Sequence, residues 1–366
     1  MRIPLSAPDI VERDIDAVVE VLRTPRISLG PKLEEFETAF ARYVGVPHAV
    51  ALSSGTAGLH LGLLALGIGE GDEVILPSFT FIAAANAVLH ARATPVFVDV
   101  DARSLNLDPE RVERAITPRT RAILAVHTFG VPAKMAPLLA IAQKHGLRVI
   151  EDACEAIGAE YRGQRVGGLG DIGVFAFYPN KPITTGEGGM VTTRDASVAD
   201  TIRALRNQGR RPSDGWLDHS LLGYNFRISE MNCALGVAQM QRIDEILERR
   251  AVAAARYAEE LRGVANVMLP LDATENGKVS WFVYVLRVEN RDRIAGALAE
   301  RGIGCGKYFA PLHRQPLFAP FANRGEDFSV TEKASGQTLA LPFFTRITAE
   351  QIADVCRTFH AALARL

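Results

Sequence analysis

The stretch that decides the fold reads GVFAFYPNKPITTGEGG at residues 173–189. An apolar run, Gly173–Phe177, leads into a polar, glycine-rich turn that carries a single lysine, Lys181. A lysine held in such a turn can lose part of its hydration, which favours the free amine that attacks a carbonyl group in Schiff-base formation. Most turn lysines are ordinary surface residues, so the rest of the chain must decide between these two readings.

The chain around this stretch alternates short apolar runs with helical patterns from about residue 48 to 194. Helices are expected at Thr56–Leu66 and Lys134–His145, among others. We expect strands at His48–Leu52, Glu73–Pro77, Pro95–Val100, Ala122–His127, Arg148–Glu151, Gly173–Phe177 and Gly189–Thr193. These runs are mostly apolar throughout, as in parallel strands that helices cover on both faces. The sequence therefore predicts an α/β domain whose ligands gather at the carboxyl ends of the strands.

The rest of the chain predicts a second, smaller α+β unit. A long helical pattern, Met231–Leu261, connects the two parts. It is followed by a β-like run, a helix, an aromatic and proline-rich loop and a terminal helix, at Trp281–Val288, Arg291–Arg301, Tyr308–Pro320 and Ala349–Leu363. We place the large domain, with the N-terminal segment, at residues 1–247 and the small domain at residues 248–366.

The composition argues against several classes of protein. The net charge of the 366 residues is −1, so no basic field favours nucleic acid or an anionic membrane. The cysteines (Cys154, Cys233, Cys305 and Cys356) form no CxxC pair and indicate reduced thiols. No apolar run reaches the roughly 18 residues of a membrane span, and the first residues lack a secretory apolar core. We expect a soluble, cytoplasmic protein with no metal site.

Two predicted strands are followed by polar residues that suit a phosphorylated ring. Gly55 and Thr56 begin a helix directly after a strand, where small residues and free amides make a phosphate cradle. The alternative is an ordinary helix capped by serine or threonine. Asp152 follows another strand, where a carboxylate can keep a ring nitrogen protonated, as a pyridoxal phosphate electron sink requires. The alternative for Asp152 is an acidic residue that favours a helix N-terminus.

Two further segments have weaker signals. Phe81, in Pro77–Ile82, could stack on a flat ring, although Phe79 and Phe81 taken alone read better as core residues. Asn225 and Arg227 could bind an anion or a partner, or simply lie in a loop before a helix capped by Ser229. His313 lies in an unusual loop and has no assigned role.

Taken in this order, the segments resemble the sugar aminotransferases of the DegT/DnrJ/EryC1/StrS family, a branch of the fold type I pyridoxal phosphate enzymes. The resemblance covers nearly the whole chain. Its motifs are Ser28–Pro31, Phe36–Glu37, Ser53–Ala57, His127–Gly130, Glu151–Ala153, Phe177–Lys181, Gly186–Gly189, Gly223–Arg227 and Leu341–Phe343.

The resemblance implies a role for each candidate residue. Lys181 forms the Schiff base with pyridoxal phosphate, and Asp152 bonds the pyridine nitrogen. The remaining cofactor contacts come from Gly55 and Thr56 on the phosphate, Phe81 on the ring face, and Asn225, which reaches the phosphate from the neighbouring subunit. A homodimer with shared active sites is implied.

Two positions depart from the commonest family pattern. Ala176 stands where a serine hydroxyl often helps to bind phosphate. Glu155 stands near the cofactor's phenolic oxygen, where glutamine or histidine is common. Because an ionised carboxylate would repel a phenolate, Glu155 must be protonated, turned away, or offset by the iminium.

The function that the resemblance implies is transfer of an amino group from L-glutamate to a nucleotide-linked 4-keto or 3-keto hexose. The pathway would make polysaccharide or secondary-metabolite sugars. One alternative is a sugar 3-dehydratase, whose family members carry histidine at the position of Lys181. The other is a non-enzymatic regulator that binds the cofactor.

Overall fold

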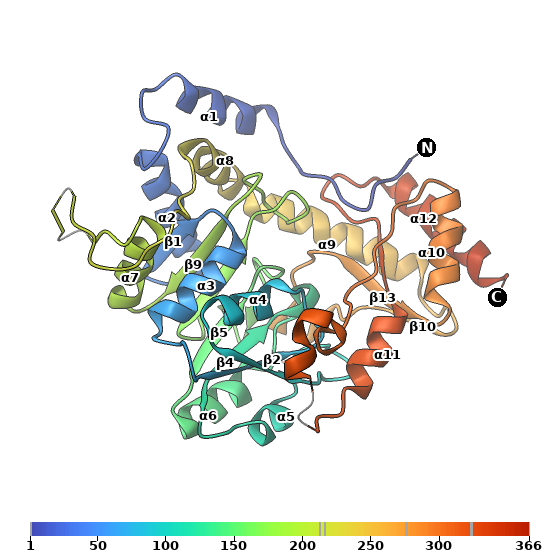
Figure 1. The fold of residues 1–366 in the computed structure, drawn as a ribbon. Helices are drawn as coiled ribbons and strands as arrows, with labels where there is room; N and C mark the ends of the chain where they lie inside the picture. Colours follow the sequence, from blue (N-terminus) through green and yellow to red (C-terminus); the bar gives the residue numbers. More distant parts are fainter. Residues whose placement is uncertain (1, 212–213, 216, 275–276, 323–324, 366) are drawn as a thin grey trace.

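The computed structural model describes residues 2–211, 214–215, 217–274, 277–322 and 325–365. Its centre is a seven-stranded sheet (Figure 1). In sheet order the strands are β1 (His48–Leu52), β9 (Gly189–Thr193), β8 (Ile172–Ala176), β5 (Arg148–Asp152), β4 (Thr120–Val126), β2 (Glu73–Pro77) and β3 (Thr94–Val98).

The sheet is mostly parallel. Strands β3, β2, β4, β5 and β8 pair in parallel, whereas β9 runs antiparallel to both of its neighbours, β8 and β1. Strand β1 therefore points the same way as β8, and all strands except β9 end at one edge, here called the carboxyl edge. The predicted α/β class with a mostly parallel sheet is confirmed.

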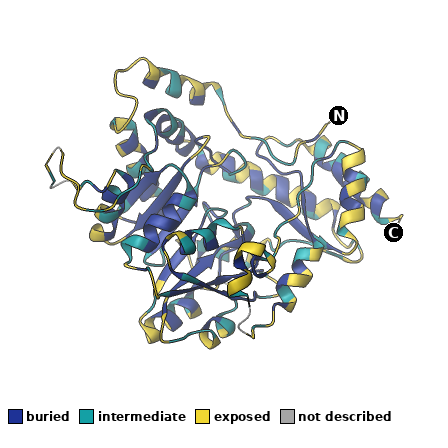
Figure 2. Ribbon diagram, in the orientation of Figure 1, coloured by how far each residue is buried: buried dark blue, intermediate teal, exposed yellow. Residues whose placement is uncertain are grey.

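Helices cover both faces of the sheet, and side chains of the strands alternate between the two layers. Val50 and Leu52 of β1 face one layer, whereas Ala49 and Ala51 face the other. The first layer contains α3 (Gly55–Ala65), α4 (Ala83–His90) and α7 (Ala196–Arg206). The second contains α2 (Pro31–Val44), α5 (Pro109–Arg114), α6 (Met135–His145) and α8 (Glu230–Met240). The buried strands form the dark centre of Figure 2.

The expected single helical pattern at Met231–Leu261 is two helices, α8 and α9 (Ile243–Glu260). Arg242 lies at the break, and its guanidinium donates to the carboxylates of Asp9 and Asp14 at 2.8 and 3.2 Å. Asp14 belongs to α1 (Glu12–Leu22), which packs on α8. The break therefore places the charged Arg242 side chain beside the N-terminal segment, which packs against α8.

The C-terminal part has its own antiparallel sheet of β10 (Val267–Met268), β13 (Tyr284–Val288) and β14 (Thr338–Leu341). One face packs on α9, α10 (Arg291–Glu300) and α12 (Ala349–Leu363), and α11 (Ser329–Gln337) precedes β14. Four short strands form a third sheet: β6 (Glu160–Tyr161), β7 (Gln164–Arg165), β11 (Ala273–Thr274) and β12 (Gly277–Lys278).

The proposed domain boundary between residues 247 and 248 falls inside α9, which continues through it, and the division stays a prediction. Near the N-terminus, Ile3 forms a bridge with Ile303 beyond α10. None of the helices in the described part of the chain combines the length and apolar character of a bilayer span.

Candidate active site

The turns at the carboxyl edge hold most of the predicted site residues. Strands β1, β2, β5 and β8 end at Leu52, Pro77, Asp152 and Ala176. Because these strands point the same way, the turns that follow them meet at one edge of the sheet. Lys181 lies after β8, Glu155 after β5, Phe81 between β2 and α4, and Gly55 and Thr56 at the start of α3.

The Lys181 side chain is largely removed from water, with 12% of it exposed. Its Nζ lies 3.8 Å from the centre of the Phe282 ring and 4.0 Å from Oε1 of Glu155. The buried Arg250 holds Phe282 in place by donating from Nη2 to the Phe282 carbonyl. The structure thus surrounds this amine with an aromatic face and a carboxyl group, an unusual environment for a turn lysine.

The Glu155 carboxyl group faces Lys181 across 4.0 Å. Its Oε2 accepts a hydrogen bond of 2.9 Å from the backbone N–H of Phe129. Burial raises the pKa of Glu155 above its ordinary value, although Lys181 and the Phe129 N–H oppose this shift. The nearby Asp152 carboxylate adds to the rise. Glu155 therefore keeps its proton more readily than a glutamate on the surface does.

The two consecutive acids at the end of β5 have different surroundings. Glu151 accepts from the backbone N–H groups of Gly167, Leu169 and Gly170, each at 2.8 Å, and contacts Nε2 of His127 at 3.1 Å. Glu151 therefore organises a loop. Asp152 accepts from the Cys154 N–H at 3.1 Å and is 8% exposed. Among the described residues, Asp152 therefore has fewer backbone donors than Glu151.

The start of α3 has the form of an anion cradle. Ser54 caps the helix by accepting from the Ala57 N–H at 3.1 Å, while the amides of the first residues have no partner inside the helix. A Cβ added to Gly55 would lie 2.8 Å from Cβ of Ala176 and 2.9 Å from Sγ of Cys154. The ends of β8 and β5 thus pack directly against the cradle.

A further polar atom fits this site. Oδ1 of Asn180, next to Lys181, is buried and has no hydrogen-bond partner among the described residues. Together with the cradle, Asp152 and the shielded amine, these groups fit a phosphorylated, planar carbonyl cofactor such as pyridoxal phosphate. Through its contacts the structure joins Gly55, Asp152, Glu155 and Lys181.

Phe81 and Asn225 make no ring contact or side-chain hydrogen bond with these four residues in the described part of the chain. Phe81 is 61% exposed, so its reading as a core residue is wrong, whereas Phe79 is fully buried. Asn225 is exposed, but the next residue, Phe226, accepts from the Ser53 N–H at 2.9 Å. The backbone of Asn225 therefore lies beside the cradle of its own chain.

The loop before α8 agrees in part with the alternative that it simply leads into a helix capped by Ser229. Ser229 caps α8, accepting from the Asn232 N–H at 3.2 Å. Arg227 donates to Oδ1 of Asn207 at 3.0 Å.

The sequence did not indicate Phe282, Phe129 or Arg250 as contributors. Phe282 and Arg250 come from the C-terminal half, and no local pattern marks them as partners of Lys181. Phe129 lies within the His127–Gly130 motif, which was the available signal, but it acts through its backbone N–H.

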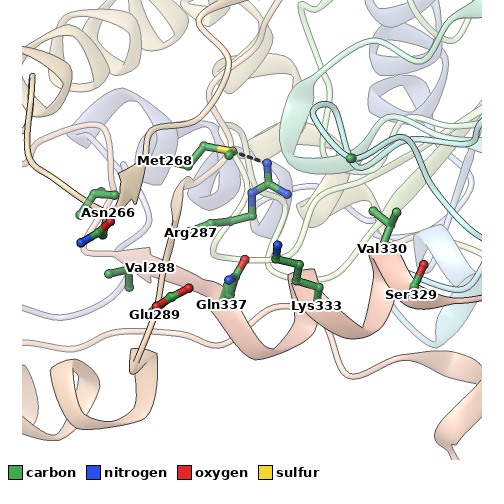
Figure 3. Close-up of a pocket in the computed structure, with 11 residues that line it drawn as sticks. Asn266, Met268, Arg287, Val288, Glu289, Ser329, Val330, Lys333 and Gln337 are labelled. Atoms are coloured by element: carbon green, nitrogen blue, oxygen red, sulfur yellow. Dashed lines mark hydrogen bonds between the residues drawn. The ribbon is translucent and has the colours of Figure 1, made fainter.

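A hollow of about 600 Å³ lies elsewhere, among β10, β13 and α11 (Figure 3). Arg287 and Lys333 line it, but none of the predicted site residues does. The described residues contain no cluster of three or more His, Cys, Asp or Glu side chains suited to a metal ion.

Comparisons with known proteins agree with this geometry. The family model described as the DegT/DnrJ/EryC1/StrS aminotransferase family matches residues 8–360. The chain is 42% identical over 357 residues to GDP-perosamine synthase of Caulobacter vibrioides, covering 96% of this chain and 95% of that protein. It is also 42% identical over 352 residues to a UDP-N-acetyl-3-dehydro-alpha-D-glucosamine 3-aminotransferase of Acidithiobacillus ferrooxidans, covering 94% of each.

A solved structure shows the same fold. The crystal structure of S. venezuelae DesV in complex with a ketimine intermediate is similar to this chain with a TM-score of 0.91 and 39% identity, covering 95% of this chain and 94% of that one.

Proposed function

The chain belongs to the DegT/DnrJ/EryC1/StrS aminotransferase family and is a pyridoxal phosphate-dependent sugar aminotransferase, and we propose that it transfers an amino group from L-glutamate to a nucleotide-linked keto hexose. The observation that carries the proposal is the shielded Lys181 amine, which lies 4.0 Å from Glu155 at the edge that also holds Asp152 and the start of α3.

Each residue of the site would hold one part of the cofactor. The amides of Gly55 and Thr56 bind its phosphate with the help of the helix dipole. Asp152 keeps a proton on the ring nitrogen, and Phe81 covers one face of the ring. When bound, pyridoxal phosphate supplies a reactive carbonyl group and a ring that accepts electrons.

Lys181 supplies the acid–base chemistry. Its Nζ would act as the general base that takes the proton from the α-carbon of the amino donor. The Phe282 ring covers this amine on one side and limits the water around it.

The names of the relatives support the sugar substrate. One relative is named for a GDP-linked sugar and the other for a UDP-linked sugar that is aminated at C3. We propose a keto group at C4 or C3 as the acceptor. Lys181 favours transamination over dehydration, because the resembling dehydratases carry histidine there. We also propose a homodimer in which Asn225 of one chain completes the site of the other; the exposed Phe81 and Asn225 side chains support it.

The test begins with the colour of the protein. Purified wild-type protein should be yellow, and L-glutamate should shift its absorption toward that of the amine form of the cofactor. A panel of keto sugar nucleotides should then reverse the shift for the true acceptor. Lys181→Ala should lower turnover about a thousandfold, whereas Lys144→Ala, at an exposed lysine on α6, should not. Wild-type turnover by Lys181→Ala would end the proposal.

A further inference from the structure

Ser78, His313 and Glu332 form a hydrogen-bonded row that the proposed chemistry does not use. Ser78 follows β2, and its Oγ lies 2.7 Å from Nδ1 of His313. The backbone N–H of His313 donates to the same Oγ at 3.2 Å. On the other side of the ring, Nε2 of His313 lies 3.2 Å from Oε1 of Glu332, on α11.

The ring of His313 is fixed from several directions. It stacks on Phe328 with ring centres 4.0 Å apart and planes at 12°. The neighbouring Leu312 donates its backbone N–H to the Ser78 carbonyl at 2.9 Å. The row has the residue types of a nucleophilic triad, but Ser78 is fully buried, so no substrate reaches its hydroxyl. A positioning role remains.

The row lies directly behind the predicted ring-covering turn. Ser78 is followed by Phe79, whose ring meets Phe129 edge-on at 6.1 Å. The N–H of Phe129 in turn donates to Glu155, which faces Lys181. Phe81 ends the same turn. Moving Ser78 would therefore displace both an aromatic neighbour of the site and the residue proposed to cover the cofactor.

We propose that His313 is a positioning residue for the cofactor site: by holding Ser78, it sets the turn at residues 78–81 over the cofactor. Glu332 orients the ring, since a carboxylate at Nε2 leaves Nδ1 free to accept from Ser78. This inference rests on the proposed function, because it concerns the same cofactor.

Two substitutions of one residue separate positioning from packing. The amide of asparagine reaches the place of Nδ1, and that of glutamine reaches the place of Nε2. His313→Asn keeps the contact with Ser78 and should bind pyridoxal phosphate within about twofold of wild type. His313→Gln and Ser78→Ala lose that contact and should bind about tenfold more weakly, the loss expected for one buried hydrogen bond. His360→Gln, at an exposed histidine on α12, is the control.

Binding is measured by titrating cofactor-free protein and following its absorbance, with the thermal midpoint recorded for each cofactor-free variant. Equal weakening by His313→Asn and His313→Gln means that the ring acts by packing alone and overturns the inference. Ser78→Ala that binds pyridoxal phosphate as tightly as wild type also overturns the inference. This variant alone tests the inference if His313→Gln does not fold. Wild-type protein that binds no pyridoxal phosphate overturns the proposed function and the inference with it.

Discussion

At the scale of single residues, charge at the site depends on a buried carboxyl beside a buried amine. Glu155 and Lys181 are each 12% exposed at the side chain, so water screens neither group well. Burial also raises the pKa of Cys154 well above its ordinary value, and the neighbouring Asp152 adds to the rise. The thiol is therefore a packing group against Gly55 and not a nucleophile.

The raised pKa of Glu155 predicts how stability changes with pH. A carboxyl whose pKa is higher in the folded chain stabilises the fold below its unfolded pKa, about 4.3, and this contribution is lost as pH rises through the folded value. Glu155→Gln does not titrate, so its stability relative to wild type should increase from pH 5 to pH 8. Urea unfolding of the cofactor-free protein measures this difference. A stability difference that stays constant over this pH range would contradict the prediction.

The close packing around Gly55 predicts that a larger residue there destabilises the fold. An added Cβ would contact Ala176 and Cys154 at less than 3.0 Å, so Gly55→Ala must push α3 away from the strand ends. We expect a stability loss of about 1–3 kcal/mol and weaker cofactor binding. Gly296→Ala is the matched control: the residue is in a helix, and beyond the backbone of that helix no atom of the described residues would lie within 4 Å of an added Cβ. It should gain about 1 kcal/mol, and equal losses for both variants would refute the close-contact argument.

At the scale of elements, one helix caps another. Glu230, the first residue of α8, is buried and accepts from the Lys32 and Leu33 N–H groups at 2.8 and 3.0 Å. These are free amides in the first turn of α2, where negative charge is favourable. Gly30 is required beside it, because a Cβ there would lie 2.6 Å from Oε2 of Glu230.

Replacing Glu230 by glutamine should therefore destabilise the contact between α2 and α8. The glutamine amide carries no charge, and its NH₂ group faces one of the helix N–H groups, donor against donor. We therefore expect the free energy of unfolding to fall by about 2 kcal/mol. Chemical unfolding measures it against Glu35→Gln, which removes only an exposed pair with Lys32 on α2. A loss no larger than that of the control would show that the cap contributes little.

The elements also show what sequence patterns can predict. Strands β1, β2 and β9 begin and end at the expected residues, because apolar runs and glycine turns are local signals. The break between α8 and α9 was missed, since it depends on Arg242 meeting Asp9 from the distant N-terminal segment. The predicted parallel sheet placed ligands at the carboxyl ends of the strands, where the turns after β5 and β8 lie. Phe282 stayed unpredicted because only tertiary packing brings it to Lys181.

At the scale of the whole molecule, the N-terminal segment links the two halves of the chain. Asp9 pairs with Arg242 at the helix break and with Arg346 after β14. Burial acts to raise the pKa of Asp9, but hydrogen bonds from these two arginines outweigh it and lower the pKa. Ile3 joins the core of the C-terminal sheet. Contacts of the N-terminal segment thus reach both sides of the proposed domain boundary.

The proposed sharing of active sites between two chains concerns the whole molecule, and complementation can test it. If Asn225 serves the partner's site, mixed dimers of Lys181→Ala and Asn225→Ala chains contain one site with both native residues. Equal co-expression gives half mixed dimers, each with one intact site of two, so about a quarter of wild-type activity should return. The alternative is that Asn225 serves the site of its own chain, since its neighbour Phe226 contacts Ser53 of the same chain. If Asn225 serves its own chain's site, every site lacks one residue and co-expression restores nothing beyond the residual activity of Asn225→Ala.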